Sequence, residues 1–145
     1  MTRPPLDILR EVAERLGYLS VLHGCPPPSA DGYEIVAAVD FHGGQHGGQS
    51  GTISIGCGPG IGAALAANML ATSKPDFETA REAVLELANV VAGNVIAVLH
   101  PDDELRLDPP HQARWPVTTR VVVALQTDEG VISLAVSPPQ SAHLP

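Results

Sequence analysis

Apolar residues recur at the three- and four-residue spacing of a helix in three stretches of the chain, at about 5–16, 61–72 and 76–99. The first stretch is amphipathic and is followed by Gly17, a residue that often ends helices. The third is much the longest, with Pro75 and Asp76 as start signals and Pro101 just past its end. We therefore expect three helices, the last of them long.

The remaining apolar runs are short, and the segment 52–55 alternates polar with apolar residues, as a half-buried strand does. We predict strands at about 18–22, 33–41, 51–56, 104–107, 115–126 and 131–136, with Asp128-Glu129-Gly130 as a tight turn. The order of helix, strands, two helices and strands lacks the strict alternation of a parallel α/β sheet. It favours an α+β fold, in which an antiparallel sheet carries helices on one face.

The composition is that of a globular protein, with 44% apolar and 17% charged residues in a chain of 145. We expect a single domain over residues 1–145, with its core at about 5–137 and a frayed, proline-containing tail at 138–145. The net charge is −8 and Lys74 is the only lysine, which argues against nucleic acid or a membrane surface as partner. Because we expect no bilayer-spanning apolar run and find no signal-peptide layout, we predict a cytoplasmic protein.

Several segments suggest other chemistry, but none has the full pattern that it needs. The glycines of 56–62 lack the register of a dinucleotide fingerprint and the Lys-Ser or Lys-Thr of a phosphate-binding loop. His42 and His46, with Asp40, could share a metal, but His46 lies in the glycine-rich loop 43–50, which we interpret as a solvated hairpin tip. Cys25 and Cys57 are expected to be free thiols.

The most informative pattern lies within the long helix. Glu82, Glu86, Asn89 and Gly93 fall at i, i+4, i+7 and i+11, so they share one side of it. Asparagine and glycine are poor residues for a helix interior, and glycine costs about 1 kcal/mol relative to alanine. From spacing alone, the stripe is either a surface that a partner approaches or the ordinary polar side of an amphipathic helix.

The opposite side of the same helix is apolar, and we expect it to enter the core. It consists of Phe77, Ala80, Val84, Leu87, Val91, Val95 and Val98.

The segment Glu86-Leu87-Ala88-Asn89-Val90-Val91-Ala92-Gly93-Asn94-Val95 resembles the signature helix of the CheC/CheX family of chemotaxis phosphatases, nearest the single-motif CheX type. The order of elements over about 5–137 is similar as well. The resemblance implies two long helices packed side by side on an antiparallel sheet. It also implies a homodimer joined through sheet edges, for which the apolar run 117–125 is a candidate edge.

The resemblance further implies a phosphatase that acts on the aspartyl phosphate of a response-regulator receiver domain. Asn89 would orient the attacking water, and Glu86 would engage the lysine of the receiver. Glu82, Gly93, Asn94 and Pro110 would contact the partner. No cofactor of its own is implied, because Mg²⁺ would be held by the receiver.

The chain departs from the family pattern at two places. Glu82 stands where Asp or Ser is usual, and Gln112 stands where a proline is expected, with Pro109 and Pro110 slightly early. The alternative is therefore a docking or regulatory module that keeps the fold without turnover. Leu65, three residues before Asn68, replaces the glutamate that a second motif would need, so we predict one site in each protomer.

Overall fold

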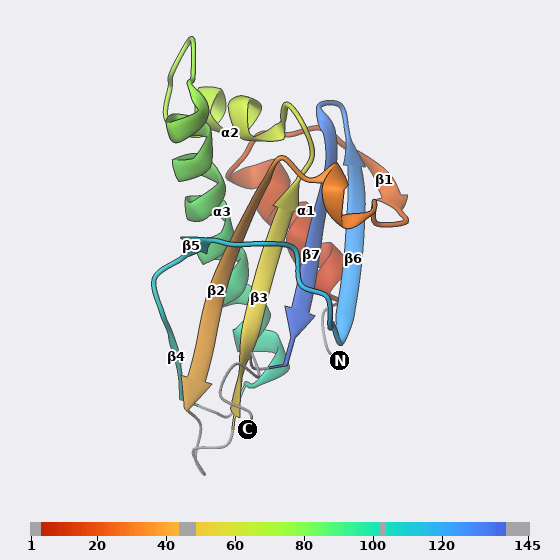
Figure 1. Cartoon of the computed structure of the whole chain (residues 1–145), viewed down its shortest axis with the longest axis vertical. Coiled ribbons are helices and arrows are strands. Elements are labelled where there is room, and N and C mark those ends of the chain that lie inside the picture. The colour runs from red at the N-terminus through yellow and green to blue at the C-terminus, as the bar shows by residue number, and fades with distance from the viewer. Residues whose placement is uncertain (1–3, 44–48, 102–103, 139–145) are drawn as a thin grey trace.

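The computed structural model describes residues 4–43, 49–101 and 104–138, in which three helices accompany a single sheet (Figure 1). The helices are α1 (Pro5–Arg15), α2 (Ile61–Met69) and α3 (Phe77–Leu99), and a 3₁₀ turn, η1, covers Ala30–Gly32. The strands are β1 (Val21–Cys25), β2 (Ile35–Gly43), β3 (Gln49–Cys57), β4 (Leu105–Leu107), β5 (His111–Gln112), β6 (Val121–Thr127) and β7 (Gly130–Ser137).

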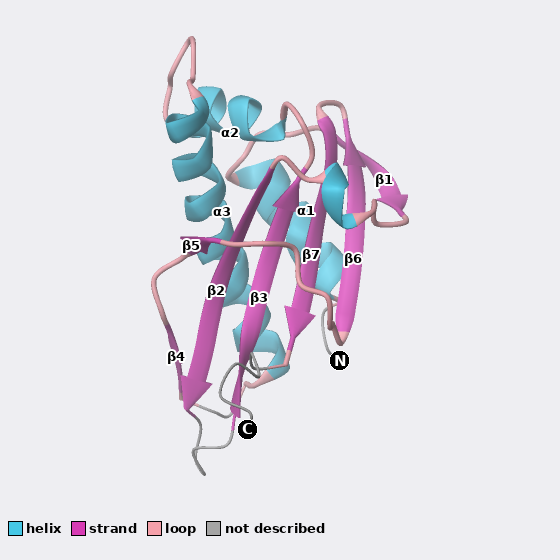
Figure 2. Ribbon diagram, in the orientation of Figure 1, coloured by secondary structure: helices cyan, strands magenta, loops and turns pink. Residues whose placement is uncertain are grey.

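The sheet is antiparallel throughout its described pairs, in the order β1-β6-β7-β3-β2-β4, with β5 also paired to β2. Helices α1 and α3 lie on one face of it, and the shorter α2 packs against α3 at one end (Figure 2). The predicted α+β class with helices on one face of an antiparallel sheet is thus confirmed.

The two faces of the sheet follow from strict alternation along its central strands. Ile53, Ile55 and Cys57 of β3 point into the core beneath the helices. Thr52 and Ser54 point to the other face, where the neighbouring strands also present small residues. One face of the sheet is therefore apolar and packs against α1 and α3, while the other presents small and polar side chains.

Helix α3 is the central element of the fold, in contact with α1, α2, β2 and β3. It is long and apolar enough to cross a membrane by length and composition alone, so our expectation that no run qualifies was wrong. Burial in the core accounts for its apolar residues, because 44% of the apolar stretch that is long enough to span a membrane is buried inside the protein. Nine of its residues, including Leu87, Val91 and Val95, are fully or almost fully enclosed.

Two strand predictions were wrong in their bounds. The first strand begins at Val21 rather than residue 18, because Tyr18 adopts a left-handed conformation with φ of 52° that cannot continue a strand. Strand β6 begins at Val121 rather than residue 115. The hairpin tip at 44–48 and the tail from 139 lie outside the described residues.

Residues 113–120, which we call the crossing segment, account for the second difference. They run across the polar face of the sheet from β5 to β6 (Figure 1). The segment is tied down at both ends, since the N–H of Ala113 donates to Val36 O at 2.9 Å and that of Arg120 donates to Val136 O at 2.7 Å. The segment therefore passes over the sheet instead of extending it.

Candidate functional site

Helix α3 begins at a well-formed cap. The Asp76 carboxylate accepts hydrogen bonds from the N–H and the hydroxyl of Thr79, each at 2.8 Å. These bonds hold the pKa of Asp76 below its ordinary value. The predicted start signal is confirmed, and the cap fixes the helix register that places the polar stripe.

Along α3, the predicted stripe is exposed over its whole length. Glu82, Glu86, Asn89 and Gly93 are all solvent-exposed, while Ala83, Leu87 and Ala88 between them are buried. The division of α3 into a buried and a polar side was therefore predicted correctly, with one exception. Phe77 was assigned to the core, but its side chain is 52% exposed because it occupies the first turn, beyond the edge of the packed layers.

Two polar groups of the stripe have no partner among the described residues. Within the described part of the chain, the carboxylate of Glu86 and the amide of Asn89 make no hydrogen bond or ion pair. A Cβ added to Gly93 would meet no atom within 4 Å. Internal packing therefore gives no reason for a glycine here, and both polar groups are free to engage something from outside.

Glu86 also lines an open groove of about 450 Å³ between the ends of α1 and α2 and the middle of α3. Leu16, Met69 and Leu70 give the groove an apolar wall, and Arg15 and Tyr18 stand at its rim. The sequence did not predict this groove, since its walls come from three separate segments. An anionic group beside an apolar hollow suits a partner that presents a cation next to apolar surface.

The family model described as Chemotaxis phosphatase CheX matches residues 35–114, more than half of the chain, and this range includes the whole α3 stripe. The chain belongs to the CheX family. No curated protein sequence matches it.

Solved structures with the CheX fold are similar over nearly the whole chain. The chemotaxis protein CheX of Desulfovibrio desulfuricans has a TM-score of 0.70 at 18% identity, covering 94% of this chain and 97% of that one. CheX of Vibrio vulnificus has a TM-score of 0.72 at 17% identity, covering 92% and 93%. The CheX–CheY–BeF3–Mg²⁺ complex of Borrelia burgdorferi gives 0.68 at 18% identity, covering 94% and 96%.

Two further residues were expected to contact a partner, Asn94 and Pro110. Asn94 is exposed, but it sits about 100° around the helix from Gly93, and its Nδ2 donates to Val90 O at 2.8 Å. Pro110 is half-buried in the connection from β4 to β5, two strands that both contact α3.

Asn68 is a structural residue. Its Nδ2 donates to Gly17 O at 2.8 Å, which ties the end of α2 to the turn after α1. With Leu65 buried three residues earlier, this segment holds no second Glu-x-x-Asn motif.

The metal hypothesis gains no support from the described residues. No group of three or more His, Cys, Asp or Glu there could hold a metal ion, and His46 lies outside them. His42 Nε2 lies 3.1 Å from Asp108 Oδ1, while Asp40 accepts a hydrogen bond from Thr52 at 2.6 Å. Cys25 and Cys57 are free, as expected, and burial raises the pKa of both thiols.

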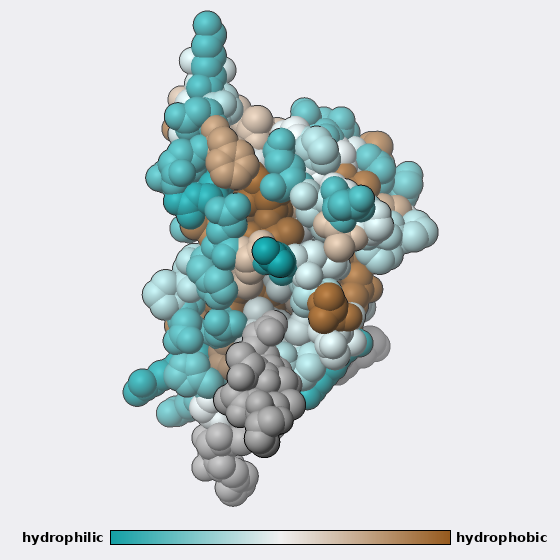
Figure 3. Space-filling view, in the orientation of Figure 1, coloured by the Kyte–Doolittle hydropathy of each residue, from teal (hydrophilic) through white to brown (hydrophobic). Residues whose placement is uncertain are grey.

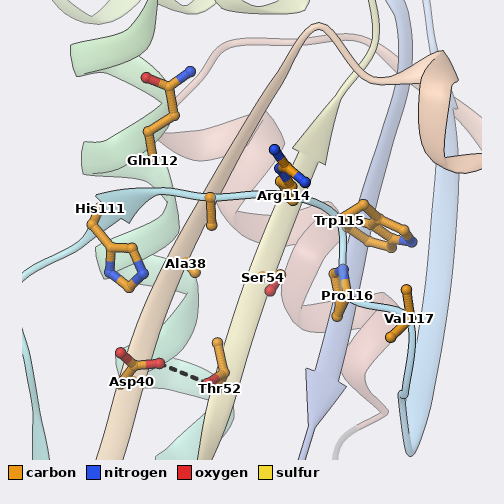
Figure 4. Close-up of a pocket in the computed structure, with 11 residues that line it drawn as sticks. Ala38, Asp40, Thr52, Ser54, His111, Gln112, Arg114, Trp115, Pro116 and Val117 are labelled. Atoms are coloured by element: carbon orange, nitrogen blue, oxygen red, sulfur yellow. Dashed lines mark hydrogen bonds between the residues drawn. The ribbon is translucent and has the colours of Figure 1, made fainter. Parts of the chain in front are cut away.

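A second hollow, of about 470 Å³, lies between the crossing segment and the sheet (Figure 4). The imidazole of His111 points toward Asp40 there, and Gln112 points the other way. In the space-filling view this face is mostly hydrophilic, with apolar colour confined to small patches (Figure 3). None of the motif residues of the CheX stripe lines this hollow.

Proposed function

We propose that this CheX-family protein is a phosphatase that hydrolyses the aspartyl phosphate of a response-regulator receiver domain. The observation that carries the proposal is the exposed pair Glu86 and Asn89, one turn apart on a well-supported helix and without partners in the described chain. The resemblance of the fold to a CheX that was crystallised with CheY, BeF3 and Mg²⁺ supports the choice of partner.

Asn89 is proposed to orient the attacking water. Its side-chain amide both donates and accepts hydrogen bonds, so it can hold a water in line with the bond that breaks. The water oxygen forms a bond to phosphorus and the bond from phosphorus to the aspartate oxygen breaks. The aspartate leaves as a free carboxylate, and the proton of the water ends on inorganic phosphate.

Glu86 is proposed to hold the receiver in register. The receiver supplies a lysine and bound Mg²⁺, which neutralise the charge of the phosphoryl group. Its exposed carboxylate, one helical turn from Asn89, is proposed to pair with that lysine. Glu86→Ala should then mainly raise KM, by roughly tenfold, because the pairing is made equally before and during the reaction.

The rival function is a docking module without turnover, and Glu82 and the early prolines favour it. Both functions require binding of a receiver, but only the phosphatase requires faster loss of the acyl phosphate.

We also propose a homodimer and a cytoplasmic location, where receivers would meet the protein. Strand β1 pairs with only the 124–127 half of β6, so among described strands the edge of Val121, Val122 and Val123 has no neighbour on that side. This is a shorter edge than the predicted 117–125, but it is apolar and open to a second copy.

The test is the decay of phosphorylated receivers from the same genome, in Mg²⁺, with the wild type, with Asn89→Ala or without the protein. Acceleration by the wild type alone is the expected result. Binding without acceleration across the receivers would favour the docking module, and equal acceleration by the Asn89→Ala variant would contradict the assigned site.

A further inference from the structure

Tyr18 has a strained backbone conformation beside the site. Its φ of 52° lies in the left-handed region, which bulky side chains rarely adopt. Tyr18 is also 70% exposed, so the strain is not offset by burial. Backbone strain of this kind costs about 1–3 kcal/mol and concentrates at functional sites.

The turn around Tyr18 is held firmly from both sides. Gly17 has no room for a side chain, because an added Cβ would lie 2.6 Å from Leu65 Cδ2. The carbonyl of Gly17 accepts the hydrogen bond from Asn68, and the N–H of Leu19 donates to Ala13 O at 3.1 Å. Leu19 itself is buried. These contacts fix the backbone and leave the ring of Tyr18 outside the core.

That ring stands at the rim of the groove that Glu86 lines from α3. Tyr18 and Glu86 line the same groove, so a partner that fills it from the side of Glu86 would also contact Tyr18. The apolar wall of Leu16 and Leu70 adds surface that a purely electrostatic contact would not need. Rigid, exposed aromatic residues beside such hollows are frequent anchors of protein interfaces.

We propose that Tyr18 is a specificity-determining residue, which packs on apolar surface next to the lysine of the receiver and so selects which receiver is accepted. This inference rests on the proposed function, since the occupant of the groove is the same receiver that Glu86 engages. Tyr18 takes no part in the chemistry; it acts on binding.

The experiment compares Tyr18→Asn with Tyr18→Phe. Asparagine tolerates the left-handed conformation, so Tyr18→Asn removes the ring and keeps the turn. Val117→Ala is the matched control, because Val117 is a fully exposed apolar residue of the crossing segment. The readouts are KM and kcat for receiver dephosphorylation, and Kd for receivers loaded with beryllofluoride and Mg²⁺.

We expect Tyr18→Asn to raise KM and Kd by roughly tenfold with kcat within about twofold, and Tyr18→Phe and Val117→Ala to match the wild type. The loss should be largest for the receiver that the wild type accepts best. Thermal unfolding should show that the Tyr18→Asn variant is at least as stable as the wild type, since asparagine replaces a bulky side chain in a left-handed turn.

Two outcomes would overturn the proposal, and they are distinguishable. If the wild type accelerates decay and Tyr18→Asn keeps its KM and Kd, or loses only kcat, Tyr18 does not determine specificity and the phosphatase assignment stands. If the wild type neither binds nor dephosphorylates any receiver, the proposed function fails and this inference fails with it.

Discussion

Two hollows described above are nearly equal in size, about 450 Å³ beside α3 and about 470 Å³ under the crossing segment, but the carboxylates that line them differ. Under the crossing segment, the carboxylate of Asp40 accepts a hydrogen bond from the hydroxyl of Thr52 at 2.6 Å. On α3, Glu86 and Asn89 are free among the described residues. Satisfied polar groups stabilise a fold, whereas free ones on a rigid support are available to a partner. Size alone would not have separated the two regions.

The largest effect is expected for a substitution in the stripe of α3, which should remove activity and leave the fold intact. Asn89→Ala should lower kcat by roughly 100-fold, similar to the loss of one positioned amide in other hydrolytic sites. Stability should rise slightly, by up to about 0.6 kcal/mol, because alanine is the better helix former. Receiver dephosphorylation and urea unfolding of the same preparation measure both. A variant that loses activity by unfolding would not support the assignment.

On the other side of the sheet, a substitution is expected to lower stability and leave activity unchanged. The Trp115 ring packs on Tyr33 with centroids 4.4 Å apart, and both rings lie close over Gly56. Trp115→Ala should therefore destabilise the fold by about 2 kcal/mol, since a half-buried aromatic residue is lost. Activity per folded molecule should stay at the wild-type value. Trp115→Phe is the milder control, and a selective loss of activity would assign function to the crossing segment.

Gly93→Ala sharpens the contrast within the stripe itself. Because an added Cβ meets open space, the substitution should stabilise the helix by about 1 kcal/mol. If a partner backbone approaches closely here, the same methyl group should weaken receiver binding. Denaturant titration measures the expected gain in stability, and Kd for a beryllofluoride-loaded receiver measures the expected loss of binding. Unchanged binding would show that the partner does not approach this glycine.

The smallest effect is expected at Val117, which is fully exposed. Val117→Ser should change the free energy of unfolding by less than about 0.5 kcal/mol, and activity not at all. Sedimentation of the wild type and of the Val117→Ser variant should also give the same mass, since the proposed dimer edge begins at Val121. A change in mass would place the dimer contact on the crossing segment.

Local pattern was sufficient to predict α3, its cap and its exposed stripe, because helical periodicity and capping depend on neighbours in sequence. Local pattern failed where contacts between segments distant in sequence determine the conformation. Residues 115–120 were predicted to belong to a strand, but the crossing segment runs over the sheet, because Ala113 and Arg120 donate backbone hydrogen bonds to Val36 and Val136 of other strands. The groove beside Glu86 and the strained turn at Tyr18 depend on the contact between α2 and the end of α1, which no local pattern records.

The central position of α3 has a consequence for the lifetime of the site. The residues between its polar positions are packed against two helices and the sheet, so the stripe cannot detach or fray while the rest of the protein stays folded. Local opening is the low-energy motion of peripheral loops, whereas an element of this kind opens only with the whole molecule. The partner-facing surface is therefore preformed, and a receiver that docks on it bears little cost of ordering the α3 backbone.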